Sequence, residues 1–334
     1  MAATEGQLDG DGADAAQVGW RHTLRQIRRD PTAMAGLVIV VFVVAVATFS
    51  MIDSNLHRLT FGSVERYYFA ELIPGLENPE EIPPPGELNA WESAWFVEGS
   101  LLSLQDMMQY QLGTDHQGRD YLSRIVYGSR ISVSVGISAS LLGLFGGVTI
   151  GAVAGYYGGW VDDVLMRLVE TIYSIPALIL VIVFTVFASR GDPDVTYAVI
   201  GVSITAIPVF ARIIRSRVLS VREMEYIEAA RAAGVTDYNI ILRHVIPNSF
   251  APVLVYATLY IGVSILIVAG LSFLGYGAQP PTPDWGAMLD HSHGQMHSNP
   301  WSSVWPGMAI LIAVMGFNLF GDGLQDALDP RIKN

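Results

Sequence analysis

Few side chains in this 334-residue sequence could do covalent chemistry, and none stands in a pattern typical of catalysis. The only lysine is Lys333, whereas a phosphate-binding loop needs a lysine after Gly-x-x-x-x-Gly to contact the β- and γ-phosphates. The serine within residues 270–275 lacks the spacing of a nucleophile elbow, and the sequence has no His-Glu-x-x-His motif. Asp322 ends an apolar stretch, where a solvated carboxylate costs less than a catalytic one. We therefore expect no enzyme activity and no ATPase site in this chain.

A metal site is the other chemistry that the side chains suggest. His291, His293 and His297 lie close together in sequence, next to Met288 and Met296, and three imidazoles could hold one nickel ion. The same stretch contains Gly, Ser and Pro residues, which are typical of an exposed loop. The chain has no cysteine, so thiolate metal sites and disulfides are excluded. We expect neither a metal ion nor a bound cofactor.

The most informative polar pattern lies in residues 220–248, SVREMEYIEAARAAGVTDYNIILRHVIPN. Glu228 stands there among small residues, beginning with Ala229 and Ala230. Small side chains let a groove of another protein close onto a helix backbone, and a glutamate can fix the register through a charged hydrogen bond. We interpret this segment as a docking helix, although most helical glutamates are only solvated.

Turn residues divide this segment into two short helices. Gly234 is expected to end the first helix, and Thr236 or Asp237 to cap the second. Pro247 is expected to end the second helix before the next apolar stretch begins.

A second polar cluster precedes a long apolar stretch. It consists of Asp115, Arg119, Asp120 and Arg124. We expect these residues to form a local charge network, with direct contact to a solute as the alternative.

The composition points to a lipid environment. Hydrophobic residues make up 51% of the chain and charged residues only 15%, whereas soluble domains carry about a quarter charged residues. The formal net charge is −12, and no basic face is large enough for nucleic acid. The first apolar run lacks the order of a cleavable signal peptide and reads as a membrane anchor.

Six stretches meet or approach the roughly 20 apolar residues that a helix needs to cross about 30 Å of hydrocarbon. They are Ala33–Ile52, Ile131–Ala154, Val164–Ala188, Val195–Ala211, Ala251–Leu274 and Val304–Phe320. The sequence therefore predicts an all-α polytopic membrane protein with six transmembrane helices.

The distribution of arginine predicts the orientation. Four arginines precede the first span and six lie between the fourth and fifth spans, on the same side as Arg331 and Lys333. The other side holds a loop with five arginines against twelve acids and a 273–303 loop without Lys or Arg. We expect the arginine-rich side, with both termini, to be cytoplasmic.

The remaining segments follow from this topology. Residues 1–19 read as a disordered acidic tail, and residues 20–32 as an amphipathic interfacial helix. Residues 33–52 are the first span and residues 53–130 an extracytoplasmic loop. A core of five spans occupies residues 131–322, and 323–334 form a cytoplasmic tail. The outer loop contains Pro83-Pro84-Pro85 and an aromatic stretch with Trp91, Trp95 and Phe96, for which we predict either contact with a partner or a cover over the pore mouth.

The second span carries glycines every four residues, at Gly143, Gly147, Gly151 and Gly155. This spacing places them on one helix face, where a neighbouring backbone can approach closely. We predict a helix–helix interface, with a lining of the solute path as the lesser alternative. Pro176 and Pro208 are expected to kink the third and fourth spans.

Ion-driven transport inside this chain is not expected. The cores of the first, second, fifth and sixth spans contain no ionisable residue, and a driving ion usually needs one. In the others, Arg167, Glu170 and Arg212 are expected about a turn or two from the cytoplasmic ends.

Several motifs together resemble one family. Glu228-Ala229-Ala230, Gly234 and Ile246-Pro247 resemble the EAA loop of ATP-binding-cassette (ABC) importer permeases. Other segments look like the DppC/OppC branch of these permeases, in the order of the chain: Leu112–Asp115 with Gly118–Asp120 and Ser123-Arg124, Gly270–Gly275, Pro283–Gly286, Phe317–Leu319 and Asp326–Arg331. The resemblance covers residues 20–334 and implies a type I ABC importer permease fold.

The resemblance also implies partners and a solute class. Such a chain translocates dipeptides, oligopeptides or a related solute such as nickel complexes, and docks onto an ATPase through its EAA loop. Its partners would be a DppB/OppB-like permease, two DppD/DppF-like ATP-binding subunits, an extracytoplasmic solute-binding protein and membrane lipid. The alternatives are an ATP-independent channel or secondary carrier, and a non-transporting scaffold or sensor.

Overall fold

The computed structural model describes residues 20–59, 67, 73, 76, 78–80, 112–115, 117–191, 194–294, 296–297 and 299–328. Within these residues the secondary structure is helical, without a strand. The elements are α1 Trp20–Ile27, α2 Pro31–Leu59, α5 Tyr121–Tyr157, α6 Gly159–Tyr173, α7 Ala177–Ala188, α8 Val195–Val221, α9 Glu225–Ala232, α10 Asp237–Ile240, a π-helical turn Ile241–Val245, α11 Ile246–Phe273, α12 Trp285–His293 and α13 Trp301–Leu328. The all-α polytopic fold class is confirmed.

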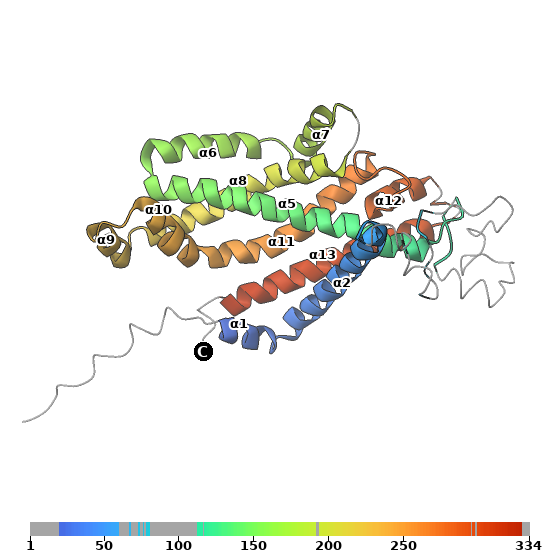
Figure 1. Cartoon of the computed structure of the whole chain (residues 1–334), viewed down its shortest axis with the longest axis horizontal. Coiled ribbons are helices and arrows are strands. Elements are labelled where there is room, and N and C mark those ends of the chain that lie inside the picture. The colour runs from blue at the N-terminus through green and yellow to red at the C-terminus, as the bar shows by residue number, and fades with distance from the viewer. Residues whose placement is uncertain are drawn as a thin grey trace, which may run out of the picture.

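The long helices form an elongated bundle (Figure 1). Helix α5 packs against α8 and α11, and α13 packs against α2 and α11. Helices α9 and α10 lie at one end of the bundle, as does α1 beside the end of α13, whereas α12 lies at the opposite end. The order of the helices thus brings the arginine-rich loop, α1 and the end of α13 to the same end.

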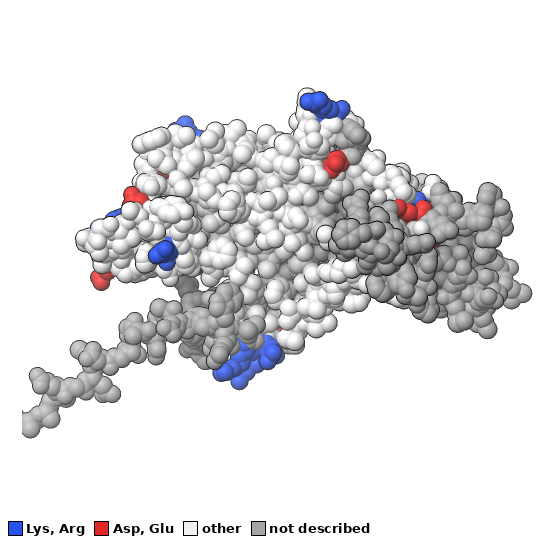
Figure 2. Space-filling view, in the orientation of Figure 1, with Lys and Arg blue, Asp and Glu red and all other residues white. Residues whose placement is uncertain are grey.

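The lengths and apolar character of the helices fit a membrane protein. In the described part of the chain, five helices are long and apolar enough to cross a membrane, and the bent pair α6–α7 makes a sixth if it is one span. Most of the charged side chains on the face in Figure 2 lie toward the ends of the bundle, and the surface between is largely uncharged.

Several spans are longer than the sequence predicts, and two of the extensions contain partly or fully buried arginines. Helix α5 begins ten residues before the predicted start at Ile131, because buried Arg124 and Arg130 find polar partners there. Helix α8 continues ten residues beyond Ala211, and Arg215 in this extension forms a two-pronged ion pair with Asp162 of α6 at N–O distances of 2.5 Å. An apolar window misses both extensions because it counts these arginines as interruptions.

Proline has different effects at the two predicted kinks. The third predicted span is broken rather than kinked: α6 and α7 meet at an angle of 90° across residues 174–176, and Pro176 caps α7. Pro208 lies inside the continuous helix α8.

The prediction that Pro247 ends a helix is wrong. Pro247 lies in the first turn of α11, where a missing backbone N–H costs little. The π-helical turn connects α10 directly to α11, and within it the N–H of Ile246 donates to the carbonyl of Ile241. The side chain of Asn248 donates to the His244 carbonyl at 2.6 Å. This wider turn lets the helix continue through the proline.

Several predicted features lie outside the described residues. They are the acidic tail 1–19, the triple proline at 83–85, the aromatic stretch around Trp91 and the last six residues with Arg331 and Lys333.

Candidate functional site

Helix α9 presents an exposed polar face at one end of the bundle. Its anchor is Ile227, which is fully buried in a cluster with Ile214 and Val218 of α8 and with Ile240. Glu228 and Ala229 lie on the opposite, exposed side of the helix. A rigidly held helix with an exposed glutamate beside small side chains can enter a groove of another protein.

One tyrosine ties both short helices to the bundle, and the sequence analysis missed it. Tyr156, near the end of α5, donates its hydroxyl to Asp237 at the start of α10 at 2.6 Å. It also accepts a hydrogen bond from Nε of Arg231 on α9 at 3.4 Å, and the Arg231 guanidinium lies 5.1 Å from the ring centroid. No local pattern could pair Tyr156 with Asp237, because 81 residues separate them.

The turn between α9 and α10 depends on Gly234. This residue has φ of 75°, a conformation that a side chain disfavours, and it is exposed. Thr236 holds the N-cap position of α10 with extended backbone, but its side chain accepts no capping hydrogen bond from the first turn. The predicted two-helix division at Gly234 therefore matches the backbone of the segment.

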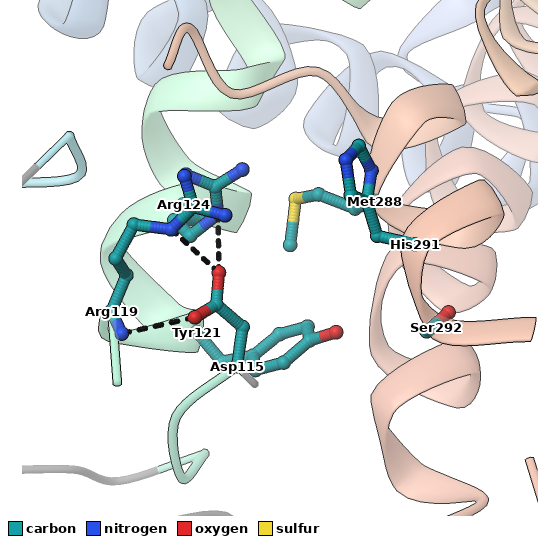
Figure 3. A pocket seen from close by; sticks show the side chains of 7 residues that line it. All are labelled: Asp115, Arg119, Tyr121, Arg124, Met288, His291 and Ser292. Carbon is teal, nitrogen blue, oxygen red and sulfur yellow. Dashed lines mark hydrogen bonds and ion pairs between the residues drawn. The ribbon is translucent and has the colours of Figure 1, made fainter. Parts of the chain in front are cut away.

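Three of the four residues of the predicted outer charge network, Asp115, Arg119 and Arg124, meet at the start of α5 (Figure 3). Asp115 accepts from Nε of Arg119 at 2.7 Å and lies 3.5 Å from Nε of Arg124. Asp120 is the N-cap of α5 and accepts from the Ser123 N–H at 2.6 Å. All four are buried. Their contacts with one another and with the backbone fit a structural network.

Beside this network lies a small cavity. It has a volume of about 10 Å³, roughly that of one water molecule, and is also lined by Tyr121 and by Met288, His291 and Ser292 of α12. A cavity of this size cannot admit a peptide.

A second buried polar network, missed from the sequence, joins the outer loop to α2 and α5. Tyr127 donates to Asp53 at 2.5 Å, and Tyr67 donates to Glu80 at 2.6 Å. Arg130 lies 3.5 Å from Glu80 and donates to the Tyr67 hydroxyl at 3.2 Å. The members of this network come from three segments that are far apart in the sequence, so their spacing does not predict that they meet.

The start of α12 is fixed to α5 by Asp284. This fully buried residue is the N-cap of α12 and accepts from the Ser132 hydroxyl at 2.7 Å. Next to it, the indole of Trp285 donates to the Ile125 carbonyl at 2.8 Å. Burial raises the pKa of the Asp284 carboxyl, although the bond from Ser132 opposes this effect.

We expect Asp284→Ala to lower the free energy of unfolding by about 1–2 kcal/mol, because α12 loses its cap. Asp284→Asn should keep most of the stability, since an amide oxygen can still accept these bonds. The raised pKa means that the folded state binds a proton more tightly than the unfolded state, so wild-type stability should rise as pH falls through that pKa. Thermal unfolding in detergent from pH 8 to pH 5 measures this rise. A rise of equal size in Asp284→Asn would contradict the assignment.

The four glycines of α5 all face α8. A Cβ atom at Gly143 would lie 2.3 Å from Cβ of Ala206, and one at Gly151 would lie 2.2 Å from the Ala211 carbonyl oxygen. A Cβ atom at Gly147 would lie 2.5 Å from Cβ of Phe210, and one at Gly155 would lie 3.0 Å from Cβ of Val218. The row is a close helix–helix interface.

The three histidines do not converge. His291 and His293 bond through Nδ1 to the carbonyls of Ala287 and Asp290, on their own helix. In the part of the chain that the structure describes, no group of three or more His, Asp or Glu side chains could hold a metal ion.

Comparisons with known proteins agree with this geometry. Residues 147–334 match the family described as binding-protein-dependent transport system inner membrane component, and residues 20–56 match the N-terminal transmembrane domain of oligopeptide transport permease C. The chain is 38% identical over 317 residues to the dipeptide transport system permease protein DppC of Alkalihalophilus pseudofirmus, covering 94% of this chain and 91% of that protein. It is 44% identical over 223 residues to the glutathione transport system permease protein GsiD of Pectobacterium atrosepticum, covering 67% and 73%.

A solved structure shares the fold. The chain resembles an inward-facing form of the MetNI methionine ABC transporter with a TM-score of 0.51 and 20% identity, covering 62% of this chain and 97% of that chain.

Proposed function

Because the chain belongs to the family of binding-protein-dependent transport system inner membrane components, and so is a permease subunit of an ABC importer, we propose that it carries short peptides across the cytoplasmic membrane. The observation that carries this proposal is the similarity to a dipeptide permease along 94% of the chain. The similarity to glutathione permeases points to the same solute class, since glutathione is a modified tripeptide. An ATP-independent channel finds no support in these relatives.

The coupling site is proposed to be the exposed face of α9. Glu228 and Ala229 would enter a groove of the ATPase, with the half-buried Ala230 beside them packed against the core, while Gly234 sets the turn and Pro247 begins the following span. Closure of the ATPases on ATP would then move α9 and, through Ile227 and Tyr156, the ends of α8 and α5. This chain would supply geometry, and ATP hydrolysis would belong to other subunits.

The partners follow from this arrangement. We expect a second, homologous permease, two ATP-binding subunits at the end that carries α9, and a solute-binding protein at the end that carries α12. This orientation makes the α9 end and both chain termini cytoplasmic, in line with the arginines of the α8–α11 connection.

Reconstitution of the complete complex in proteoliposomes tests the proposal. Radiolabelled dialanine or glutathione should accumulate only when the binding protein and ATP are both present. Liposomes that contain this chain alone should show no uptake. Uptake by the chain alone would contradict the importer role, and stimulation of ATP hydrolysis only by a nickel chelate or an oligosaccharide would contradict the peptide assignment.

A further inference from the structure

Helix α6 exposes a polar stripe along the side of the bundle. Asp163, Arg167, Glu170 and Ser174 are all exposed, and at 3.6 residues per turn they fall within an arc of about 60°. The face of α6 that packs on α5 and α8 is different, and it carries the buried residues Met166 and Val169. A third, apolar face bears the exposed side chains of Val164 and Leu168, 49% and 60% exposed.

The stripe runs from the α9 end of the bundle, where α6 begins, toward the middle of the bundle. The guanidinium of Arg212 on α8 stacks over the Tyr173 ring at 3.8 Å, so the end of α6 is level with Arg212. Arg212 precedes the end of α8 by nine residues, which is about 14 Å of helix. A centred 27-residue helix of about 40 Å extends beyond a hydrocarbon layer of about 30 Å by only about 5 Å at each end, so Arg212 lies within that layer. Arg212 is therefore about 9 Å inside the layer, which is the turn or two expected from the sequence, and Glu170 and Arg167 lie about one and two turns of α6 nearer to its edge.

The charges of this stripe are only partly compensated within the described residues, where Asp163 and Glu170 act on Arg215 without forming an ion pair with it. In the described part of the structure, the side chains of Arg167 and Glu170 form no ion pair, whereas neighbouring Asp162 and Arg215 pair with each other. Unpaired charges at membrane depth face water or another protein rather than lipid, since their exposure to hydrocarbon is costly.

The broken backbone at the end of α6 gives a second, independent indication. Residues 174–176 separate α6 from α7 with a bend of 90°, and all three are exposed. Non-helical backbone at membrane depth occurs where it is covered by protein or lines a water-filled cavity, because its polar groups need partners. The break and the charged stripe lie on the same helix and adjoin each other at Ser174.

We propose that the polar stripe of α6, together with Arg212, lines the water-filled solute pathway and contacts the two charged ends of a zwitterionic solute. Arg167 and Arg212 suit a carboxylate, and Glu170 suits an ammonium group. The assignment of charged ends rests on the proposed peptide function. The adjacent Val164 and Leu168 face lipid or a dry protein surface.

The absence of cysteine from the chain makes accessibility directly measurable. Single variants Arg167→Cys, Glu170→Cys and Ser174→Cys would be assembled into the full complex and treated with a charged, membrane-impermeant methanethiosulfonate. They should react at least about tenfold faster than the matched controls Val164→Cys and Leu168→Cys on the same helix, because a thiol in apolar surroundings rarely ionises. Equal or slower labelling of the three stripe positions would overturn the pathway and indicate a dry interface with the second permease.

A charge comparison tests the role of Arg212. At Ser174→Cys, an anionic reagent should react faster than a cationic one, relative to their rates with a free thiol, and adding Arg212→Gln should reduce this preference severalfold. An unchanged preference would remove Arg212 from the pathway. Both experiments use complexes that still hydrolyse ATP with their ATPase bound, so a negative result would leave the importer role intact while rejecting this lining.

Discussion

Glu228→Arg is expected to release the ATPase subunit while leaving the permease folded and inserted. Glu228 is exposed on α9, beside Ala229, and makes no side-chain contact that holds the described structure together. Replacing a charged hydrogen-bonding partner in an interface by the opposite charge should weaken docking by about 2 kcal/mol or more, roughly thirtyfold in the dissociation constant. Co-purification of the ATPase and ATP-driven uptake measure this loss.

Two further variants provide a control and a second test of docking. Asp326→Arg makes the same change of charge at the exposed end of α13 and should retain the ATPase. Gly234→Leu should also weaken docking, because a leucine disfavours φ of 75° and alters the turn that follows α9. Normal co-purification of the ATPase with both Glu228→Arg and Gly234→Leu would refute the coupling assignment.

Gly151→Leu is expected to prevent α5 and α8 from packing together. Even a Cβ atom at this position would lie 2.2 Å from the Ala211 carbonyl oxygen and 2.5 Å from a side-chain carbon of Ile214. The helices would have to separate, so the free energy of unfolding should fall by about 3 kcal/mol. The yield of monodisperse protein and its thermal midpoint in detergent measure the effect, and Gly151→Ala should give a smaller loss of the same sign.

Gly307→Ala on α13 is the matched control. A Cβ atom there meets no other atom within 4 Å. Alanine at a helical position stabilises the helix relative to glycine by about 0.5–1 kcal/mol, so this variant should be neutral or slightly more stable. If Gly151→Leu and Gly307→Ala had the same stability, close packing would not be the role of the glycine row.

The length of the apolar runs was sufficient to predict the helical fold but not the limits of the helices. Two predicted spans begin or end beside an arginine, whereas α5 and α8 continue through Arg130 and Arg215 because distant segments supply Glu80 and Asp162 as partners. Pairing across the bundle is a tertiary property, and a local apolar window cannot contain it. Similarly, proline chemistry predicts a kink at Pro176 and a helix end at Pro247. The helix instead breaks at Pro176, and a π-helical turn lets it continue through Pro247.

The candidate site was predictable where its role is local. The division at Gly234 depends on backbone chemistry within a few residues, and it lies where the sequence places it. The hydrogen bond of Tyr156 to Asp237 joins residues that are 81 positions apart in sequence. The bond from Ser132 to Asp284, the N-cap residue of α12, joins residues that are 152 positions apart. Such pairs become visible only when the helices are assembled.

The coupling role of α9 is tested most directly by the side of the membrane on which the helix is exposed and by its contact with the ATPase. Ala229→Cys provides a single exposed thiol next to Glu228, and an impermeant maleimide can be applied to right-side-out and to inside-out membrane vesicles. The thiol should be labelled only in inside-out vesicles, and the bound ATPase subunit should protect it from the maleimide. Labelling of right-side-out vesicles, or no labelling from either side after the ATPase is stripped away, would contradict the docking of this helix onto a cytoplasmic motor.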